Sequence, residues 1–157
     1  MILPSSKLMP VILAALKRGQ RVRMTVNGSS MLPFIHNDDT VELEPLRAPP
    51  QVGEIVLAQG LEEQYVIHRV VCAKGGSFYL RGDAQTNREG PLASKNLFGK
   101  VIQSERKGQI RIHSRGIWHI LGRIWLYTHP IGFYLFQSYL KLRRMGGKVL
   151  RWLRVIS

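Results

Sequence analysis

Residues 64–72, Gln-Tyr-Val-Ile-His-Arg-Val-Val-Cys, form the most strongly β-prone run of the chain. β-Branched and aromatic side chains dominate this run, and such residues favour a pleated strand. The glycine pair at 75–76 and the residues 77–81 follow it directly, which predicts a β-hairpin. On the other side, Gly53 opens a mostly apolar strand over residues 54–58. These segments therefore predict consecutive strands.

Further short strands are predicted on both sides, because alternating or β-prone residues are bounded there by turn residues. The polar stretch 84–96 is predicted to be a loop. Residues 20–114 are therefore expected to form a mainly β domain, compact and of barrel or sandwich type. The further strands cover residues 21–26, 40–43, 97–103 and 109–113.

Residues 1–19 are predicted to form mainly a short helix (5–18), which Ser5 or Ser6 can cap. Its apolar run, residues 8–16, is much shorter than the roughly 20 residues that span a bilayer. No small-x-small cleavage pattern follows this run. We therefore expect neither an N-terminal transmembrane anchor nor a clear signal peptide.

The net charge of +13 is concentrated in the last third of the chain. Residues 1–105 carry 12 Lys and Arg against 10 Asp and Glu, whereas residues 106–157 carry 11 Lys and Arg and no acid. An excess of this kind is typical of a surface that meets a polyanion, either phospholipid headgroups or nucleic acid.

Apolar and aromatic residues recur at helical spacing from Gly116 onward and are interleaved with the basic residues. We predict two amphipathic helices in residues 115–157, lying at an anionic membrane surface with their aromatic side chains at headgroup depth. The alternative is that these helices pack on the β domain and that their charges are only solvated. A nucleic acid partner is not expected, because the region is apolar and tryptophan-rich rather than a polar recognition helix. The predicted location is therefore membrane-associated.

Residues 28–33, Gly-Ser-Ser-Met-Leu-Pro, present a serine where the strand at 21–26 breaks into a turn. This position suits a nucleophile, because backbone N–H groups gather at turns and can face a developing oxyanion. A serine after a glycine is also a common turn or cap residue. A catalytic serine needs a base. His68 is the candidate, because the period-two pattern of its strand allows an exposed polar side chain there, although a strand histidine can equally be structural.

Cys72 is the only cysteine, so an intramolecular disulfide and a zinc site made of cysteines are both excluded. The sequence shows no metal-ligand constellation and no glycine-rich phosphate loop. We therefore expect neither a metal nor another cofactor.

Five sequence blocks follow one another in the chain: residues 30–33 (Ser-Met-Leu-Pro), 52–56 (Val-Gly-Glu-Ile-Val), 67–70 (Ile-His-Arg-Val), 80–84 (Leu-Arg-Gly-Asp-Ala) and 98–101 (Phe-Gly-Lys-Val). In this order they resemble the signal peptidase I group of serine peptidases, the S24/S26-like peptidases, whose core is a β structure shared with self-cleaving SOS repressors. The resemblance covers residues 20–103. Ordinary bacterial members use a lysine as the base, whereas the endoplasmic-reticulum type, shared by archaea and some bacteria, has a histidine in a His-Arg-Val block. The chain resembles this second type.

The resemblance implies a Ser-His-acid catalytic site. Ser30 would be the nucleophile and His68 the general base, since an imidazole can take the hydroxyl proton and return it to the leaving amine. The third member is either Asp83, which matches the family's Gly-Asp block, or Glu89, where the family often has an aspartate. We rank Asp83 first because its motif is intact.

The resemblance also implies an oxyanion site and a substrate site. Family members often have a hydroxyl residue two before the nucleophile, but this chain has Gly28 there. The backbone N–H of Ser30, helped by Ser29, would then hold the oxyanion. The family binds its substrate as an extended strand beside a sheet edge. Met24 and Met31 are expected to line the shallow pockets near the cut, although each can equally belong to the core.

These observations together predict a membrane-associated serine endopeptidase resembling signal peptidase I. Its substrate would be an extended peptide or protein precursor segment, cut after a small residue. The alternative is a non-catalytic or self-cleaving regulator or scaffold that has the same β core and binds a membrane or nucleic acid.

Overall fold

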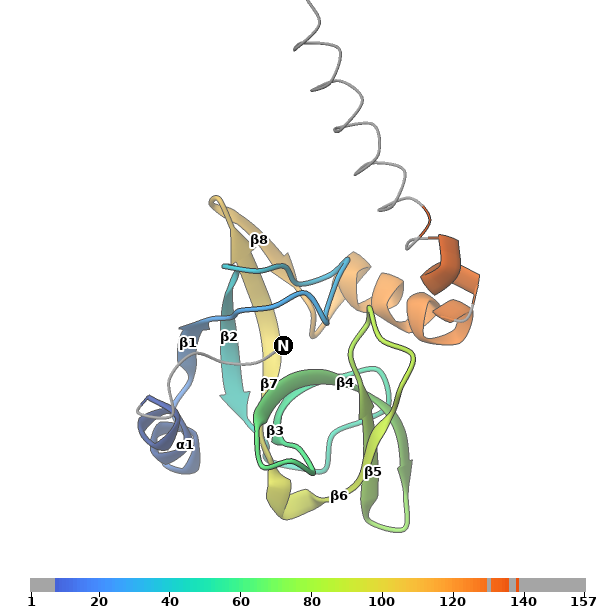
Figure 1. The fold of residues 1–157 in the computed structure, drawn as a ribbon. Coiled ribbons are helices and arrows are strands. Elements are labelled where there is room, and N and C mark those ends of the chain that lie inside the picture. The colour runs from blue at the N-terminus through green and yellow to red at the C-terminus, as the bar shows by residue number, and fades with distance from the viewer. Residues whose placement is uncertain (1–7, 130, 136–137, 139–157) are drawn as a thin grey trace, which may run out of the picture. The chain divides into compact units, whose positions relative to one another are not determined.

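The computed structural model of the chain describes residues 8–129, 131–135 and 138 (Figure 1). The chain divides into two compact units, residues 1–127 and 128–157. The first unit holds all the described strands, the N-terminal helix and a helical segment at 116–127.

Antiparallel strands make up a single eight-stranded sheet in the described part of the chain, so the expected mainly β fold is confirmed. The helix α1 (Met9–Lys17) precedes the sheet, and the short 3₁₀ helix η1 (Ser94–Asn96) lies between its sixth and seventh strands. The strands are β1 (Val22–Thr25), β2 (Thr40–Pro45), β3 (Ile55–Gln59), β4 (Tyr65–Lys74), β5 (Ser77–Arg81), β6 (Glu89–Ala93), β7 (Leu97–Arg106) and β8 (Gln109–Ile112).

The strands are ordered β1-β2-β7-β3-β4-β5-β6, and β8 pairs with β7. The strand β7 joins the two halves of the sheet, because β2 pairs along it over most of its length and β3 and β8 pair with its two ends. Figure 1 shows β1 and β2 toward one side of the domain and β5 and β6 toward the other. The strands β1 and β6 therefore end the order.

The strands β3 and β4 are buried on both faces, which explains their nearly continuous apolar sequences. Alternate residues of a strand point to opposite faces of a sheet. In β4, Ile67 belongs to a first hydrophobic cluster with α1, β1 and β2, whereas Val66 and Val70 belong to a second cluster with β5 and β6. In β3, Leu57 and Val56 divide between the two clusters in the same way. These two strands therefore form the wall between two cores.

Two segments differ from the expectation from sequence. Residues 84–96, predicted to be a loop, contain β6, which pairs with β5. The polar composition and Pro91 conceal this strand, because only Leu92 of β6 is buried and proline is tolerated at a sheet edge. The helix α1 begins at Met9, and its predicted caps at residues 5–6 lie outside the described part of the chain.

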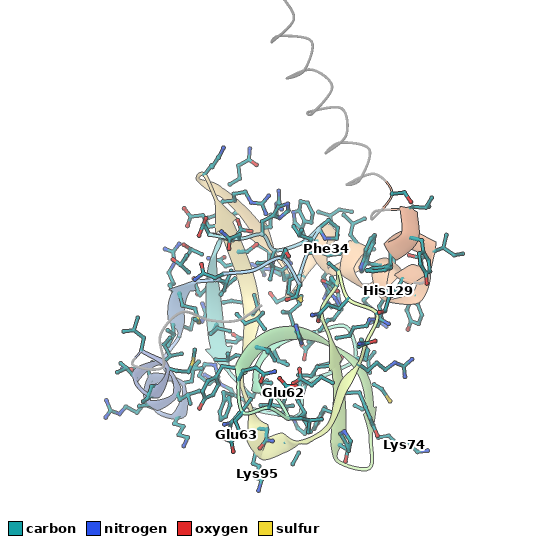
Figure 2. The ribbon with its side chains drawn as sticks, in the orientation of Figure 1. Phe34, Glu62, Glu63, Lys74, Lys95 and His129 are labelled. Carbon is teal, nitrogen blue, oxygen red and sulfur yellow. The ribbon has the colours of Figure 1, made fainter. Side chains whose placement is uncertain are left out.

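The helix at 116–127 packs on the β domain. Trp118 and Trp125 contact the first hydrophobic cluster. Trp125 meets Phe34 edge-on with ring centroids 6.0 Å apart, and Figure 2 shows Phe34 beside this helix. The guanidinium of Arg111 lies over the ring of Trp118 at 4.8 Å. This segment therefore packs on the β domain, as the alternative interpretation of the sequence expects, and the opposite side of the helix is exposed.

In the second unit, the described residues are helical, and His129 stacks on Phe133 with ring centroids 5.4 Å apart. The second predicted amphipathic helix falls mainly on residues 139–157, which the structure does not describe. Within the described ranges, no helix combines the length and the apolar character needed to cross a membrane. The contact of residues 115–157 with a membrane surface stays a prediction.

Candidate active site

Ser30 lies in the loop 27–38, at the start of a tight turn. A hydrogen bond closes the base of this loop, and a buried side chain anchors the turn in the core. The base is closed by Val26, whose N–H donates to the carbonyl oxygen of Asp39 at 2.9 Å. Met31 is fully buried, and its carbonyl oxygen accepts from two N–H groups of the following turn at 3.0 Å each. Met31 thereby fixes the turn in the core, while its neighbour Ser30 is half-buried.

Gly28 has a φ of +104°, in the left-handed region that glycine adopts without strain. Its N–H donates to Oδ1 of Asn37 at 2.8 Å, which holds the start of the turn. A hydroxyl residue, which is frequent at this position in the resembled family, would be strained in this conformation. A side-chain oxyanion donor two residues before the serine would therefore need a different backbone conformation at this position.

Residues 82–84, directly after β5, pack against the serine turn. The N–H of Ala84 donates to the carbonyl oxygen of Ser30 at 2.8 Å. Gly82 approaches this oxygen so closely that a Cβ would lie 2.6 Å from it, so a side chain is excluded. The strand β5 pairs with β4, which carries His68. The fold therefore brings the serine turn to the end of β5, beside the strand of the candidate base.

His68 is buried, with 5% of its surface exposed, although the alternation of its strand allows an exposed side chain. Its Nδ1 lies 3.4 Å from Oε2 of Glu89, the first residue of β6. The other carboxylate oxygen of Glu89 accepts from the backbone N–H of Leu61 at 3.1 Å. Gly60 leaves room for the carboxylate, because a Cβ there would lie 1.8 Å from Oε1. The turn between β3 and β4 therefore holds Glu89 beside the imidazole.

The environment of this pair favours a neutral base beside an ionised acid. Burial lowers the pKa of His68 below its ordinary 6.5, and the Glu89 carboxylate opposes this shift by favouring the imidazolium. The interaction with His68 lowers the pKa of Glu89 from 4.5. At neutral pH the imidazole is therefore uncharged and the carboxylate is anionic. Such an imidazole can accept a proton and be stabilised as a cation.

Asp83 forms an ion pair with Arg69, whereas the carboxylate of Glu89 lies next to Nδ1 of His68. Nε and Nη2 of Arg69 donate to the two carboxylate oxygens of Asp83 at 2.7 and 2.6 Å, and both side chains are buried. Nη1 of Arg69 donates to the carbonyl oxygen of Gly53 at 2.8 Å. His68 and Arg69 are consecutive in β4, so their side chains point to opposite faces. Each of the two acids therefore meets a different basic side chain.

The expected oxyanion and substrate residues differ in exposure. Ser29 is exposed and Met24 is half-buried, but Met31 is fully buried and belongs to the core rather than to a pocket wall. The carbonyl oxygen of Ser29 accepts from the N–H of Leu32 at 3.2 Å. In a trans peptide the N–H points opposite to the C=O. The N–H of Ser30 is therefore directed away from the interior of the turn.

Three residues support the site without having been assigned to it from sequence. Arg69 neutralises the buried Asp83, and Gly60 leaves space for Glu89. Trp125 donates from Nε1 to the carbonyl oxygen of Asp83 at 3.0 Å. Arg69 belongs to the His-Arg-Val block, which is a signal in the sequence. The other two become recognisable only when segments distant in sequence are brought together.

A family model described as Peptidase S24-like matches residues 5–114. This range is more than half of the 157 residues and contains α1, all eight described strands and the four candidate catalytic residues. Neither the curated proteins nor the solved structures include a match to the chain. The family match supports the broad part of the resemblance, which is the S24/S26-like peptidases. The chain therefore belongs to the Peptidase S24-like family.

Proposed function

We propose that the protein is a serine endopeptidase of the histidine-containing signal peptidase type. Ser30 is the nucleophile, His68 is the general base and Glu89 orients the base. The observation that carries this proposal is the contact of 3.4 Å between the buried imidazole of His68 and the Glu89 carboxylate, in a domain of a peptidase family. Asp83 has a supporting role, because its ion pair with Arg69 fixes the segment 82–84 under the serine turn.

The arrangement supports catalysis in two stages. Oγ of Ser30 attacks the carbonyl carbon of the scissile bond, and His68 takes the hydroxyl proton on Nε2. Glu89, at Nδ1, stabilises the imidazolium. The imidazolium then gives its proton to the leaving amine as the C–N bond breaks, which leaves an ester on Ser30. Water, deprotonated by His68, hydrolyses this ester and restores the serine.

The oxyanion of each tetrahedral intermediate is held by backbone rather than by a side chain at position 28. The N–H of Ser30 is directed out of the turn, and the neighbouring hydroxyl of Ser29 is exposed and can rotate toward the same oxygen. A preorganised donor of this kind contributes about 10²–10³ in rate. The hydrogen bond from Ala84 to the Ser30 carbonyl oxygen limits the movement of this backbone.

An extended substrate segment fits the edge strand β1. This strand ends the order of the described sheet and pairs only with β2. Its outer N–H and C=O groups are thus available for pairing with a peptide. The strand leads directly into the serine turn, so a peptide paired along β1 would approach Ser30. Val22 and Met24 are half-buried on one side of this strand and would contact the small residues near the cut.

Covalent labelling with a serine-reactive phosphonate, read by intact mass, tests the proposal. We expect one adduct on the wild-type chain and none on Ser30→Ala or His68→Ala. Ser94→Ala is the matched control, because Ser94 is exposed on η1 and should label as the wild type does. Peptides that differ only in the size of the residue before the cut then test the specificity, and small residues should be preferred.

Two results would contradict the assignment. An adduct that persists in Ser30→Ala would place the reactive group elsewhere. Absence of any adduct on folded wild-type protein would favour the non-catalytic regulator with the same core. Circular dichroism of each variant separates loss of the nucleophile from loss of the fold.

A further inference from the structure

The helix at 116–127 has two apolar sides, and only one of them is covered. Trp118 and Trp125 pack on the first hydrophobic cluster. Five other apolar side chains are between 39% and 73% exposed, and their spacing of three and four residues places them along one side of the helix. We name these residues the apolar stripe. They are Ile117, Ile120, Leu121, Ile124 and Tyr127.

The sequence around the apolar stripe is positively charged. Arg115 and Arg123 are exposed, one just before the helix and the other within it. The last acid of the chain is Glu105, and residues 106–157 carry 11 Lys and Arg. An exposed aliphatic surface without any nearby acid in sequence is unusual for a solvated helix, because polar residues normally cover the side that faces water.

We propose that the apolar stripe is a docking surface for an anionic lipid bilayer. The acyl region accepts the isoleucine side chains, and negatively charged headgroups meet Arg115 and Arg123. A second copy of this chain would bring two positive surfaces together, so charge disfavours it. A nucleic acid would meet isoleucine where polar donors are needed, so the apolar centre disfavours it. An anionic bilayer is the partner that satisfies both properties.

The covered side of the helix connects this surface to the candidate active site. Trp125 donates to the carbonyl oxygen of Asp83 at 3.0 Å, and the next residue, Ala84, donates to the carbonyl oxygen of Ser30 at 2.8 Å. The docking helix and the serine turn are thus joined through residues 83–84. A docked molecule would therefore hold its serine at a fixed place relative to the bilayer.

Co-sedimentation of the full chain with vesicles tests the docking surface without any measurement of proteolysis. Vesicles of phosphatidylcholine mixed with phosphatidylglycerol are compared with vesicles of phosphatidylcholine alone. The stripe variant Ile120→Ser/Ile124→Ser should bind the anionic vesicles at least about tenfold more weakly than wild type. The matched control is Val11→Ser/Ile110→Ser, which changes two apolar residues that lie outside the stripe and are somewhat more exposed than Ile120 and Ile124, and it should bind as wild type.

A second variant tests how much the two arginines contribute to vesicle binding. Arg115→Gln/Arg123→Gln should weaken binding to anionic vesicles by about fivefold for each charge removed and reduce its salt dependence. Binding of the stripe variant at the wild-type level overturns the proposal, as does equal binding to both kinds of vesicle. A wild-type dimer in sedimentation velocity that the stripe variant loses also overturns it and assigns the surface to a second copy. Phosphonate labelling is measured separately, so failure of docking and failure of the peptidase proposal remain distinct.

Discussion

Replacement of Glu89 by glutamine tests which acid serves His68. The carboxylate oxygen lies 3.4 Å from Nδ1, and at this distance two unit charges attract by about 5 kcal/mol in an effective dielectric of about 20. The loss of this attraction is only partly felt in the variant, because the imidazolium is costly to bury in either case and because glutamine keeps a polar group at the site. If about 3–4 kcal/mol of transition-state stabilisation is lost, labelling of Ser30 should slow by about 10²–10³-fold.

Replacement of Asp83 by asparagine should have a different signature. It leaves the buried guanidinium of Arg69 with a neutral partner, since both side chains of this ion pair are only 4% exposed. Breaking a buried pair on one side costs about 3–5 kcal/mol of folding free energy. For a chain of this size the melting temperature should fall by roughly 10 °C. Glu89→Gln removes a carboxylate that is partly exposed and should change the melting temperature much less.

The assay is the second-order rate of phosphonate labelling as a function of pH, with thermal unfolding measured on the same samples. Labelling requires a neutral His68, so its rate falls as pH decreases through the pKa of the imidazole. Glu89 raises this pKa against the effect of burial. Its removal should therefore move the acid limb of the profile to lower pH. A purely structural role for Glu89 would slow labelling without moving this limb.

The assignment of Glu89 as the partner of His68 is refuted if Glu89→Gln labels at the wild-type rate with an unmoved acid limb. It is also refuted if Asp83→Asn loses the labelling rate while its melting temperature stays at the wild-type value. Either result would make Asp83 the partner of His68, in the order that the intact Gly-Asp motif favours.

Three further predictions follow from buried or crowded groups. Burial lowers the pKa of His113 to about 4, whereas the unfolded side chain binds its proton near 6.5. The free energy of unfolding should therefore fall by about 3 kcal/mol as pH decreases from neutral to about 4. In chemical denaturation, the free energy of unfolding of His113→Gln should decrease less over the same pH range. Gly60→Ala should slow labelling nearly as much as Glu89→Gln, with the fold retained in circular dichroism, because a Cβ would displace the carboxylate. Trp125→Phe removes one N–H donor and should lower the free energy of unfolding by about 1 kcal/mol in urea titrations.

Matched variants separate these causes from general damage. Gly108→Ala introduces a side chain at a φ of +77° with nothing within 4 Å, so it measures turn strain alone and should leave the labelling rate unchanged. Trp118→Phe changes the other tryptophan of the same helix. If it destabilises the protein as much as Trp125→Phe does, the hydrogen bond to residue 83 is not the cause. If His113→Gln loses as much unfolding free energy at low pH as the wild type does, another group takes up the proton.

The strands buried on one or both faces could be predicted from sequence, because burial imposes a local pattern. The run at 64–72 is such a case, since both of its faces meet hydrophobic clusters. The edge strand at 89–93 could not be predicted, because only Leu92 is buried and the rest of its composition is polar. Met31 could not be placed either. An apolar residue in a turn fits both a pocket wall and the core, and only the packing of the loop on α1, β1 and β2 decides.

The sequence could not predict which basic side chain each of the two acids contacts, and the reason lies in the alternation of β4. Consecutive basic residues in a strand face opposite sides, so His68 and Arg69 cannot share one carboxylate side by side. A buried arginine requires a bidentate acid, and Asp83 provides it at 2.6–2.7 Å. The imidazole then needs a second acid, and Glu89 reaches it across the space that Gly60 leaves open. Glutamate in place of the family's aspartate is therefore consistent with an orienting role, because its longer side chain reaches both the imidazole and the N–H of the adjacent turn.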